Sequence, residues 1–419
     1  MTDAVHQRTE ELARIAYGRL LALLAAQYGD IDYAEDCLAD AFEAALRTWP
    51  TRGVPENPEA WLLTAARNSA RDVHRSSATQ RTESYLDTRH GAVQHIELQY
   101  TADDVPDRQL ALLFVCAHPA IDPAVRTPLM LQTVLGFDAE HIAAAFVVPP
   151  SAMAQRLVRA KRRIREARIP FVIPERDQMR GRLPSVLEAI YGAYSIDFAL
   201  VAGEERRKEL SAEALYLARL LAELLPTEAE ALGLAALLSL SIARQPARGE
   251  GDEYVPLSEQ DPARWNRELI ANGERYLHRA YALGDPGRFQ IEAAIQSVHC
   301  ARAVTGATDW SALRALYAAL VERAPTMGAR VAFAAAVGRV DGAAAGLAVL
   351  DAIGDEHVQR FQPAWATRAH LLFESGDVLA AAEAYVRAIS LTTDVAARRY
   401  LEARLELTET NMRQQRTGA

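Results

Sequence analysis

The sequence predicts an all-α protein with more than one domain. Alanine and leucine dominate the composition and β-branched residues are comparatively few, which favours helix over strand. Apolar residues also recur at helical spacing along most of the chain. With 419 residues, 50% of them hydrophobic, the chain is long enough for roughly two or three domains with cores of their own. This composition excludes a wholly disordered protein.

The first domain is predicted over residues 1–77 and consists of three helices. Residues 8–49 form two amphipathic helices that break at Gly29. Residues 50–58 are rich in proline and glycine, so we expect a loop there. A third helix covers about residues 58–76.

A linker and a second helical domain follow. Residues 78–107 lose the periodicity and are mostly polar, which predicts a linker with room for one short helix. The second domain covers residues 108–169. It contains a short helix that Asp138 is placed to cap, a tight turn ending at Pro149, and a second helix that starts near Pro150. Two helices joined by such a turn form a helix-turn-helix.

The third part of the chain is predicted to be a helical-repeat domain over residues 180–419, after a hinge at 170–179. Turn signals rich in glycine and proline separate successive Ala/Leu-rich helices. Residues 364–391 fit a tetratricopeptide repeat, and a degenerate copy surrounds residues 331–350. The signature positions are Trp365, Ala369, Leu372, Gly376, Ala381, Tyr385 and Ala388. These features predict a TPR-like α-solenoid.

The sequence gives no support to an enzyme or a metal site. None of the phosphate-loop, dinucleotide-binding, nucleophile-elbow or zinc-protease motifs occurs. Cys37, Cys116 and Cys300 are scattered, which argues against a disulfide framework and a cysteine-based zinc site. His299 lies beside Cys300 in an alanine-rich helix, where a packed core is favoured over a ligand pair. We expect no catalysis, no metal and no cofactor.

Nothing in the sequence predicts a membrane segment. The polar residues 1–12 are of mixed charge, unlike a secretory signal. The longest apolar stretch, residues 231–243, is too short to cross a bilayer. We expect a cytoplasmic protein with no membrane partner.

The positive charge is concentrated in one helix. The whole chain has a net charge of −9, but residues 154–168 carry seven basic residues against Glu166 alone, a local net of +6. One face of this helix is an apolar stripe of Met153, Leu157, Ala160 and Ile164. A lone basic helix is most often a solvated face. As the second helix of a helix-turn-helix, however, it is suited to the major groove of DNA.

Two other surfaces suit a partner. The helix at 58–76 carries arginines together with Asn68 and Trp61, a combination that suits binding to unstacked bases. Taken alone, Trp61 is better explained as a side chain packed in the core. These arginines are Arg67, Arg71 and Arg75. The preceding helix has an acidic edge. This edge either binds a basic protein partner or is an ordinary solvent-exposed surface. Its members are Glu35, Asp36, Asp40 and Glu43.

Three segments resemble the bacterial extracytoplasmic-function (ECF) sigma factors. Residues 34–42 resemble the region 2.2 helix, which docks on the clamp helices of the RNA polymerase β′ subunit. Residues 61–72 resemble the region 2.4 pattern WLxxxARNxAxD, and residues 50–58 then correspond to the loop that captures a flipped −10 base. Residues 154–161 resemble the region 4.2 helix, which reads the −35 element.

The resemblance extends to a branch of these sigma factors with a long C-terminal helical-repeat extension, through residues 113–120 and 169–171. It implies a sigma region 2 domain at 1–77 and a sigma region 4 domain at 108–169. The implied −35 contacts are Ser151, Ala152, Gln155, Arg156, Arg159, Arg162 and Arg163. The implied −10 contacts are Trp61, Arg67, Asn68, Arg71 and Arg75. The implied polymerase contacts are Glu35, Asp36, Asp40 and Glu43.

The expected function is that of an alternative sigma factor that directs core RNA polymerase to specific promoters and aids initiation. Its partners would be promoter DNA and core polymerase, through the β′ clamp helices and the β flap. The repeat domain would regulate activity, with a protein effector, or would merely stabilise the chain. The alternatives are a stand-alone helix-turn-helix regulator with a TPR-like sensor domain, and a peptide-binding scaffold with vestigial sigma domains.

Overall fold

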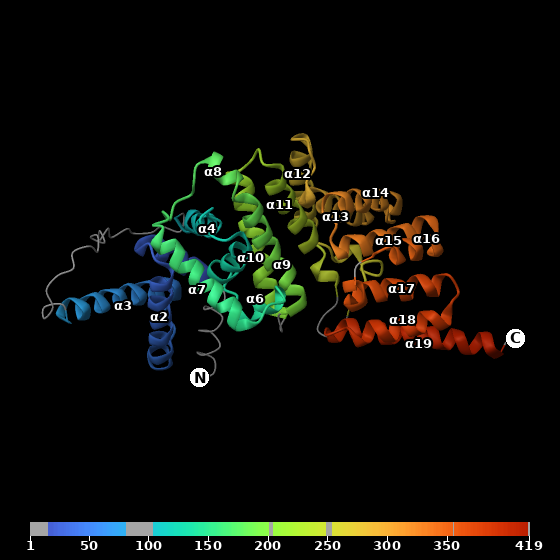
Figure 1. The fold of residues 1–419 in the computed structure, drawn as a ribbon, viewed down its shortest axis with the longest axis horizontal. Helices are drawn as coiled ribbons and strands as arrows, with labels where there is room; N and C mark the ends of the chain where they lie inside the picture. Colours follow the sequence, from blue (N-terminus) through green and yellow to red (C-terminus); the bar gives the residue numbers. More distant parts are fainter. Residues whose placement is uncertain (1–15, 81–103, 201–203, 249–253, 355, 418–419) are drawn as a thin grey trace. The chain divides into compact units, whose positions relative to one another are not determined.

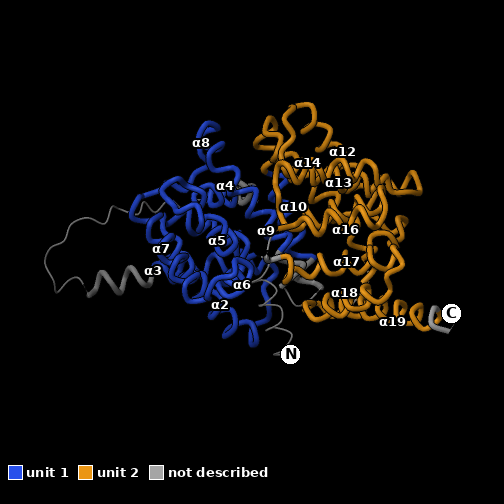
Figure 2. Tube along the Cα trace, turned by 45° about the vertical axis from the view of Figure 1, so that its right-hand side comes forward, with its two compact units in different colours: residues 1–220 blue, residues 221–419 orange. Residues whose placement is uncertain are grey.

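The computed structural model describes residues 16–80, 104–200, 204–248, 254–354 and 356–417. Every element in these ranges is an α-helix or a short 3-10 helix, which confirms the all-α prediction (Figure 1). The chain divides into two compact units, residues 1–220 and 221–419 (Figure 2). The predicted repeat region, which begins at residue 180, therefore contributes to both units.

The first three helices lie close to their predicted positions. Residues 16–28 are helical, α2 spans Ile31–Arg52 and α3 spans Pro58–Gln80. The break at Gly29 is confirmed, because the Asp30 side chain accepts a hydrogen bond from the Tyr33 N–H and caps α2. Apolar side chains from all three helices are buried, among them Leu24, Leu38, Leu62 and Trp49.

The loop between α2 and α3 is shorter than predicted. We expected residues 50–58 to be irregular, but α2 continues through Pro50 to Arg52, and Pro58 is the first residue of α3. Proline removes one N–H donor from a helix, which costs least near a helix end. Gly53, at φ 84°, then ends α2 and leaves residues 53–57 as the loop. Helix α3 also runs four residues beyond the predicted end at 76.

Four helices form the next part of the first unit. Helices α4 (Asp104–Cys116) and α5 (Pro123–Thr133) pack together, and α6 (Ala139–Ala145) and α7 (Pro150–Glu166) form a second packed pair. The predicted start of α7 at Pro150 is confirmed. Helix α4 begins at Asp104, inside the predicted linker at 78–107; the central part of that linker lies outside the described residues.

The first unit also includes the helices after the predicted hinge. These are α8 (Arg176–Arg180), α9 (Leu183–Leu200) and the first part of α10 (Glu204–Leu224). The buried Arg182 donates to the Phe114 carbonyl of α4 at 3.1 Å, and Gln109 donates to Glu213 of α10 at 2.8 Å. Helix α9 packs on α5. These contacts join the start of the extension to the core of α4 and α5.

The second unit is a series of helices that pack on their neighbours along the chain (Figure 1). The helices are α11 (Ala229–Ile242), α12 (Arg267–Ala282), α13 (Arg288–Thr305), α14 (Trp310–Arg323), α15 (Met327–Asp341), α16 (Ala343–Asp351), α17 (Gln362–Glu374), α18 (Val378–Ser390) and α19 (Val395–Thr417). In the described part of this unit, three 3-10 helices lie between them, at Gln245–Ala247, Pro262–Arg264 and Glu356–Arg360.

Small residues allow close helix pairs in this unit. A Cβ at Gly346 would lie 2.8 Å from the Gly338 Cα, so α15 and α16 approach closely at these two glycines. In the segment that fits the tetratricopeptide signature, Ala369 of α17 and Tyr385 of α18 share one buried cluster. Gly376, at φ 88°, makes the turn between α17 and α18.

Candidate nucleic-acid interface

Helix α7 presents one polar face to solvent. The predicted stripe of Met153, Leu157, Ala160 and Ile164 is buried. The residues predicted to contact DNA lie outside this stripe. Ser151, Gln155, Arg156, Arg159, Arg162 and Arg163 are exposed, and Ala152 is half-buried. Gln155 and the four exposed arginines therefore lie on a helix surface that can approach a phosphate backbone and base edges.

Helix α6 and a tight turn hold α7 in place. The Asp138 carboxylate accepts a hydrogen bond from the His141 N–H at 2.8 Å and caps α6, as predicted. Burial raises the pKa of Asp138, but its hydrogen bonds with His141 outweigh burial and bring the pKa below its ordinary value. Val147 adopts φ 54°, a strained conformation for a β-branched residue, in the turn between the two helices.

Lys161 is the exception on α7. Its side chain is only 7% exposed, and its Nζ lies 2.6 Å from Glu35 Oε2 and 3.3 Å from Asp32 Oδ1 of α2. Arg165, one turn further along α7, pairs with Asp30 at 3.2 Å. Helices α2 and α7 are thus joined by ion pairs between residues more than 120 positions apart in the sequence.

Burial and the ion pair act in opposite directions on the pKa of each partner. Burial lowers the pKa of Lys161, but the attraction of Glu35 and Asp32 outweighs it, so the pKa lies above its ordinary value. Burial raises the pKa of Glu35, against the pull of Lys161. The Glu35 carboxylate, 2.6 Å from the Lys161 ammonium group, has the geometry of a charged pair.

The predicted −10 residues share α3 but differ in exposure. Trp61 is half-buried and packs edge-on against the buried Trp49, with ring centroids 5.4 Å apart. Arg67 donates from Nε to Gln27 at 3.2 Å. Asn68 and Arg71 are exposed. Arg75 lies in α3, but its side chain is outside the described residues.

The predicted polymerase contacts form an acidic edge on α2, of which one end is covered. Asp36, Asp40 and Glu43 are exposed, and Asp40 accepts a hydrogen bond from the Ser69 hydroxyl of α3. Glu35 is half-buried beneath Lys161. This contact was not predicted from the sequence. One signal was available, because Lys161 follows Leu157 by four residues and therefore lies beside the apolar stripe.

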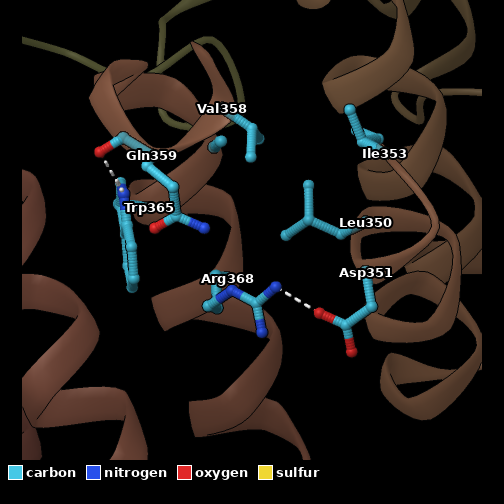
Figure 3. Close-up of a pocket in the computed structure, with 8 residues that line it drawn as sticks. Leu350, Asp351, Ile353, Val358, Gln359, Trp365 and Arg368 are labelled. Atoms are coloured by element: carbon cyan, nitrogen blue, oxygen red, sulfur yellow. Dashed lines mark hydrogen bonds and ion pairs between the residues drawn. The ribbon is translucent and has the colours of Figure 1, made fainter. Parts of the chain in front are cut away.

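A small pocket lies in the second unit between α16 and α17 (Figure 3). Its volume is about 150 Å³, and its apolar wall includes Leu350, Ile353 and Val358. On the other side Arg368 reaches across to Asp351 and lies 5.9 Å from the centre of the Trp365 ring. Drug-sized ligands occupy roughly 300–1,000 Å³, so this pocket has room for one side chain of a bound protein.

Within the described ranges, no group of three or more histidine, cysteine, aspartate or glutamate side chains is placed to hold a metal ion. Nor does any helix that the structure describes have the length and apolar content to cross a membrane. His299 and Cys300 are buried in α13, where the Cys300 thiol contacts the Leu240 carbonyl and the His299 ring packs on Trp310. The predicted packed core is confirmed at this position.

Comparison with known proteins connects these features to a family. Residues 11–80, which contain α2 and α3, match sigma-70 region 2. Residues 182–281 match a family of unknown function (DUF6596). The chain is 34% identical over 388 residues to an uncharacterised protein of Rhizobium meliloti (strain 1021), and the match covers 90% of each chain. No solved structure matches. With a region 2 domain at its N-terminus and a helical extension after it, the chain belongs to the RNA polymerase sigma factors of the sigma-70 family.

Proposed function

We propose that the chain is an ECF-type sigma factor that brings core RNA polymerase to promoters with specific −35 and −10 elements. In this proposal α6 and α7 form the helix-turn-helix that reads the −35 element in duplex DNA. Helix α3 and the loop at 53–57 contact the −10 element, and the acidic edge of α2 binds the β′ clamp helices. The protein acts in the cytoplasm and carries out no bond chemistry itself, because the polymerase supplies it.

The observation that carries this proposal is the division of α7 into a buried stripe and an exposed basic face. Gln155, Arg156 and Arg159 lie in the N-terminal half of the helix, the part of a recognition helix that contacts base edges. Arg162 and Arg163 lie further along and suit phosphate contacts. An exposed face with five such residues is a surface complementary to DNA, whereas the apolar stripe on the other side of the helix is buried.

The surface of α3 supports the second contact. Asn68 and Arg71 are exposed and lie three residues apart on α3, which also carries the half-buried Trp61 seven residues before Asn68. Aromatic rings and arginines together bind unstacked bases without requiring a duplex. This combination fits a strand that is being separated at the −10 element.

Promoter-specific run-off transcription with core polymerase tests the proposal. Replacement of Arg156 and Arg159 together by alanine should abolish transcription that depends on the −35 element. Each lost base contact is worth roughly 1–3 kcal/mol. The matched control replaces Arg176 and Arg180, which lie in α8 outside the DNA face, and should keep wild-type activity. Equal activity of both double variants would contradict the proposal.

A gel shift distinguishes the sigma factor from a stand-alone regulator. We expect tight, sequence-specific binding only when core polymerase is present, because residues 1–179 carry 20 basic and 24 acidic residues. Tight specific binding by the protein alone would instead favour the helix-turn-helix regulator.

We also propose that the extension regulates the sigma domains through a protein effector. The small pocket beside Arg368 supports a protein over a small molecule, because it accommodates one side chain. The test is a truncation after Leu224, which keeps α9 and the whole of α10 and removes α11 to α19. Promoter activity that is unchanged in vitro and in cells, with helical content retained, would contradict a regulatory role.

A further inference from the structure

An irregular segment of the second unit, residues 254–260, lies between α11 and α12 in the chain. At its first residue, the Tyr254 ring packs edge-on against Tyr400 of α19, with ring centroids 5.4 Å apart. At its other end, two main-chain carbonyls accept hydrogen bonds from Arg302 of α13. Tyr400 and Arg302 are 98 residues apart in the sequence. The segment therefore joins two helices from distant parts of the repeat series.

Arg302 is oriented by a neighbour outside this segment. Its guanidinium lies 5.1 Å from the centre of the ring of Trp265, which is buried. Two of its nitrogens donate to the Ser258 carbonyl at 2.9 Å and to the Gln260 carbonyl at 2.5 Å. Arginine presents its donors as a planar fork, and a ring beneath the guanidinium fixes the direction of that fork. Arg302 therefore recognises a pair of main-chain carbonyls in a turn, whatever side chains lie between them.

The α19 side of the contact selects side chains instead. Tyr400 offers an edge-to-face contact to an aromatic ring. Arg404 lies one turn further along α19. Burial lowers the pKa of Arg404, but Tyr385, Tyr400 and Glu259 together outweigh burial and raise it, which brings the Glu259 carboxylate close to this guanidinium. We call Arg302, Tyr400 and Arg404 the docking surface. The segment presents to it an aromatic residue and, five positions later, a carboxylate.

The segment has the features of a ligand that can be replaced. Of its seven residues only Gln260 is buried, and Tyr254 is 48% exposed. The Pro256 carbonyl accepts hydrogen bonds from the N–H groups of Glu259 and Gln260, so the turn keeps these bonds when it leaves the surface. Helices α13 and α19 form their backbone hydrogen bonds within themselves. Release of the segment therefore costs less than unfolding of either helix.

We propose that the docking surface binds a segment of a partner protein, and that residues 254–260 occupy this surface as an internal ligand when the partner is absent. The partner's segment shares the chemistry of the internal one, with an aromatic residue, a turn that presents two carbonyls, and an acidic residue five positions after the aromatic one. This proposal rests on the proposed function, because it names the chemistry by which the extension recognises its protein effector. A short tether keeps the internal ligand at an effective concentration on the order of millimolar, so only a partner that fits the surface well displaces it.

Hydrogen exchange of the full-length wild-type protein tests whether the segment detaches by itself. The amides of Glu259 and Gln260 should exchange at least about tenfold faster than amides in the middle of α13. Equal protection of the two regions would show that the segment is released only when the helices unfold, and would overturn the proposal.

Binding of a labelled peptide tests the docking surface directly. The probe is a fluorescent peptide with the sequence of residues 254–261, measured by fluorescence anisotropy. The opened variant carries Tyr254→Ala and Glu259→Ala, which remove the side-chain contacts of the internal ligand and leave the docking surface intact. The peptide should bind the opened variant at least about tenfold more tightly than wild type. The matched control, Tyr281→Ala, replaces a tyrosine of α12 that is 80% exposed and should behave as wild type.

A third substitution in the opened variant identifies the surface. Tyr400→Ala should weaken peptide binding at least about tenfold. If that protein fails to fold, Arg302→Lys keeps the charge but removes the fork, and should weaken binding in the same way. Equal peptide affinity of the opened variant and wild type, or no binding to either, would overturn the proposal. Self-association of the opened variant without peptide binding would assign the surface to a second copy of the chain and would also overturn it. Polymerase and DNA play no part in these measurements, so a failure of promoter-specific transcription would contradict the proposed function alone.

Discussion

Lowering the pH from 7 to 5 should destabilise the second unit through one buried histidine. His299 is 8% exposed on α13, and its ring packs edge-on against Trp310 with centroids 6.4 Å apart. Burial, and then the nearby cations Arg244 and Arg302, lower the pKa of His299 from 6.5 to about 3. The histidine is therefore neutral in the folded protein throughout this pH range.

The sign and the size of the change in stability follow from the shift in the pKa of His299. A pKa that is lower in the folded state gives stability that is present above pH 6.5 and is lost as the pH falls towards 3. Each pH unit below 6.5 costs about 1.4 kcal/mol, so the second unit should lose about 2 kcal/mol at pH 5 relative to its value at pH 7 and above.

The assay is hydrogen exchange at increasing urea concentration, followed on peptides from α13 and, as an internal reference, from α4. His299→Phe keeps an aromatic ring against Trp310 and removes the titration. Among the described residues, the Nδ1 atom of His299 has no hydrogen-bond partner, so this variant should remain within about 1 kcal/mol of wild type at pH 7. The reasoning is refuted if α13 in His299→Phe loses as much stability between pH 7 and pH 5 as it does in wild type.

Three other substitutions test separate parts of the structure. Gly346→Val should lower the unfolding free energy by about 1–3 kcal/mol in thermal melts, because its side chain would clash with Gly338 of α15; a melt unchanged from wild type would show that the two helices do not approach so closely. Asp138→Ala removes the cap of α6 and should lower the unfolding free energy by about 1 kcal/mol in a urea titration. In the same titration, Asp138→Asn should retain most of the wild-type stability. Arg156→Ala should reduce the slope of log affinity against log salt for promoter binding by about 1 if this side chain contacts a phosphate; a change in base preference at constant slope would assign it to base edges instead.

The helix pattern of the first unit could be predicted because its signals are local. Asp138, the turn ending at Pro149 and the apolar stripe that includes Leu157 lie within one short stretch of sequence, and their roles follow from capping and from helical periodicity. The same periodicity separated the exposed arginines of α7 from its core. The error at Pro50 shows the limit of such rules, because a proline near a helix end costs less than one in its interior.

Contacts between segments that are distant in the sequence could not be predicted from such local signals. Lys161 was counted with the other basic residues of its helix, since no local pattern identifies Glu35 as its partner. The packing of Arg182 against α4 likewise follows from tertiary structure, which places the start of the extension in the first unit. The acidic edge of α2 could be predicted from the sequence. The contact that covers Glu35, one of its members, could not.

The central claim is that α7 contacts the −35 element when the protein is bound to polymerase. Site-specific photo-crosslinking tests it most directly, with a photoreactive amino acid at Gln155 and, as a control, at the exposed Lys208 of α10. In the complex with core polymerase and promoter DNA, position 155 should crosslink to bases near −35 and position 208 should not. Crosslinks from position 155 that avoid this element, or that form equally well without core polymerase, would contradict the account.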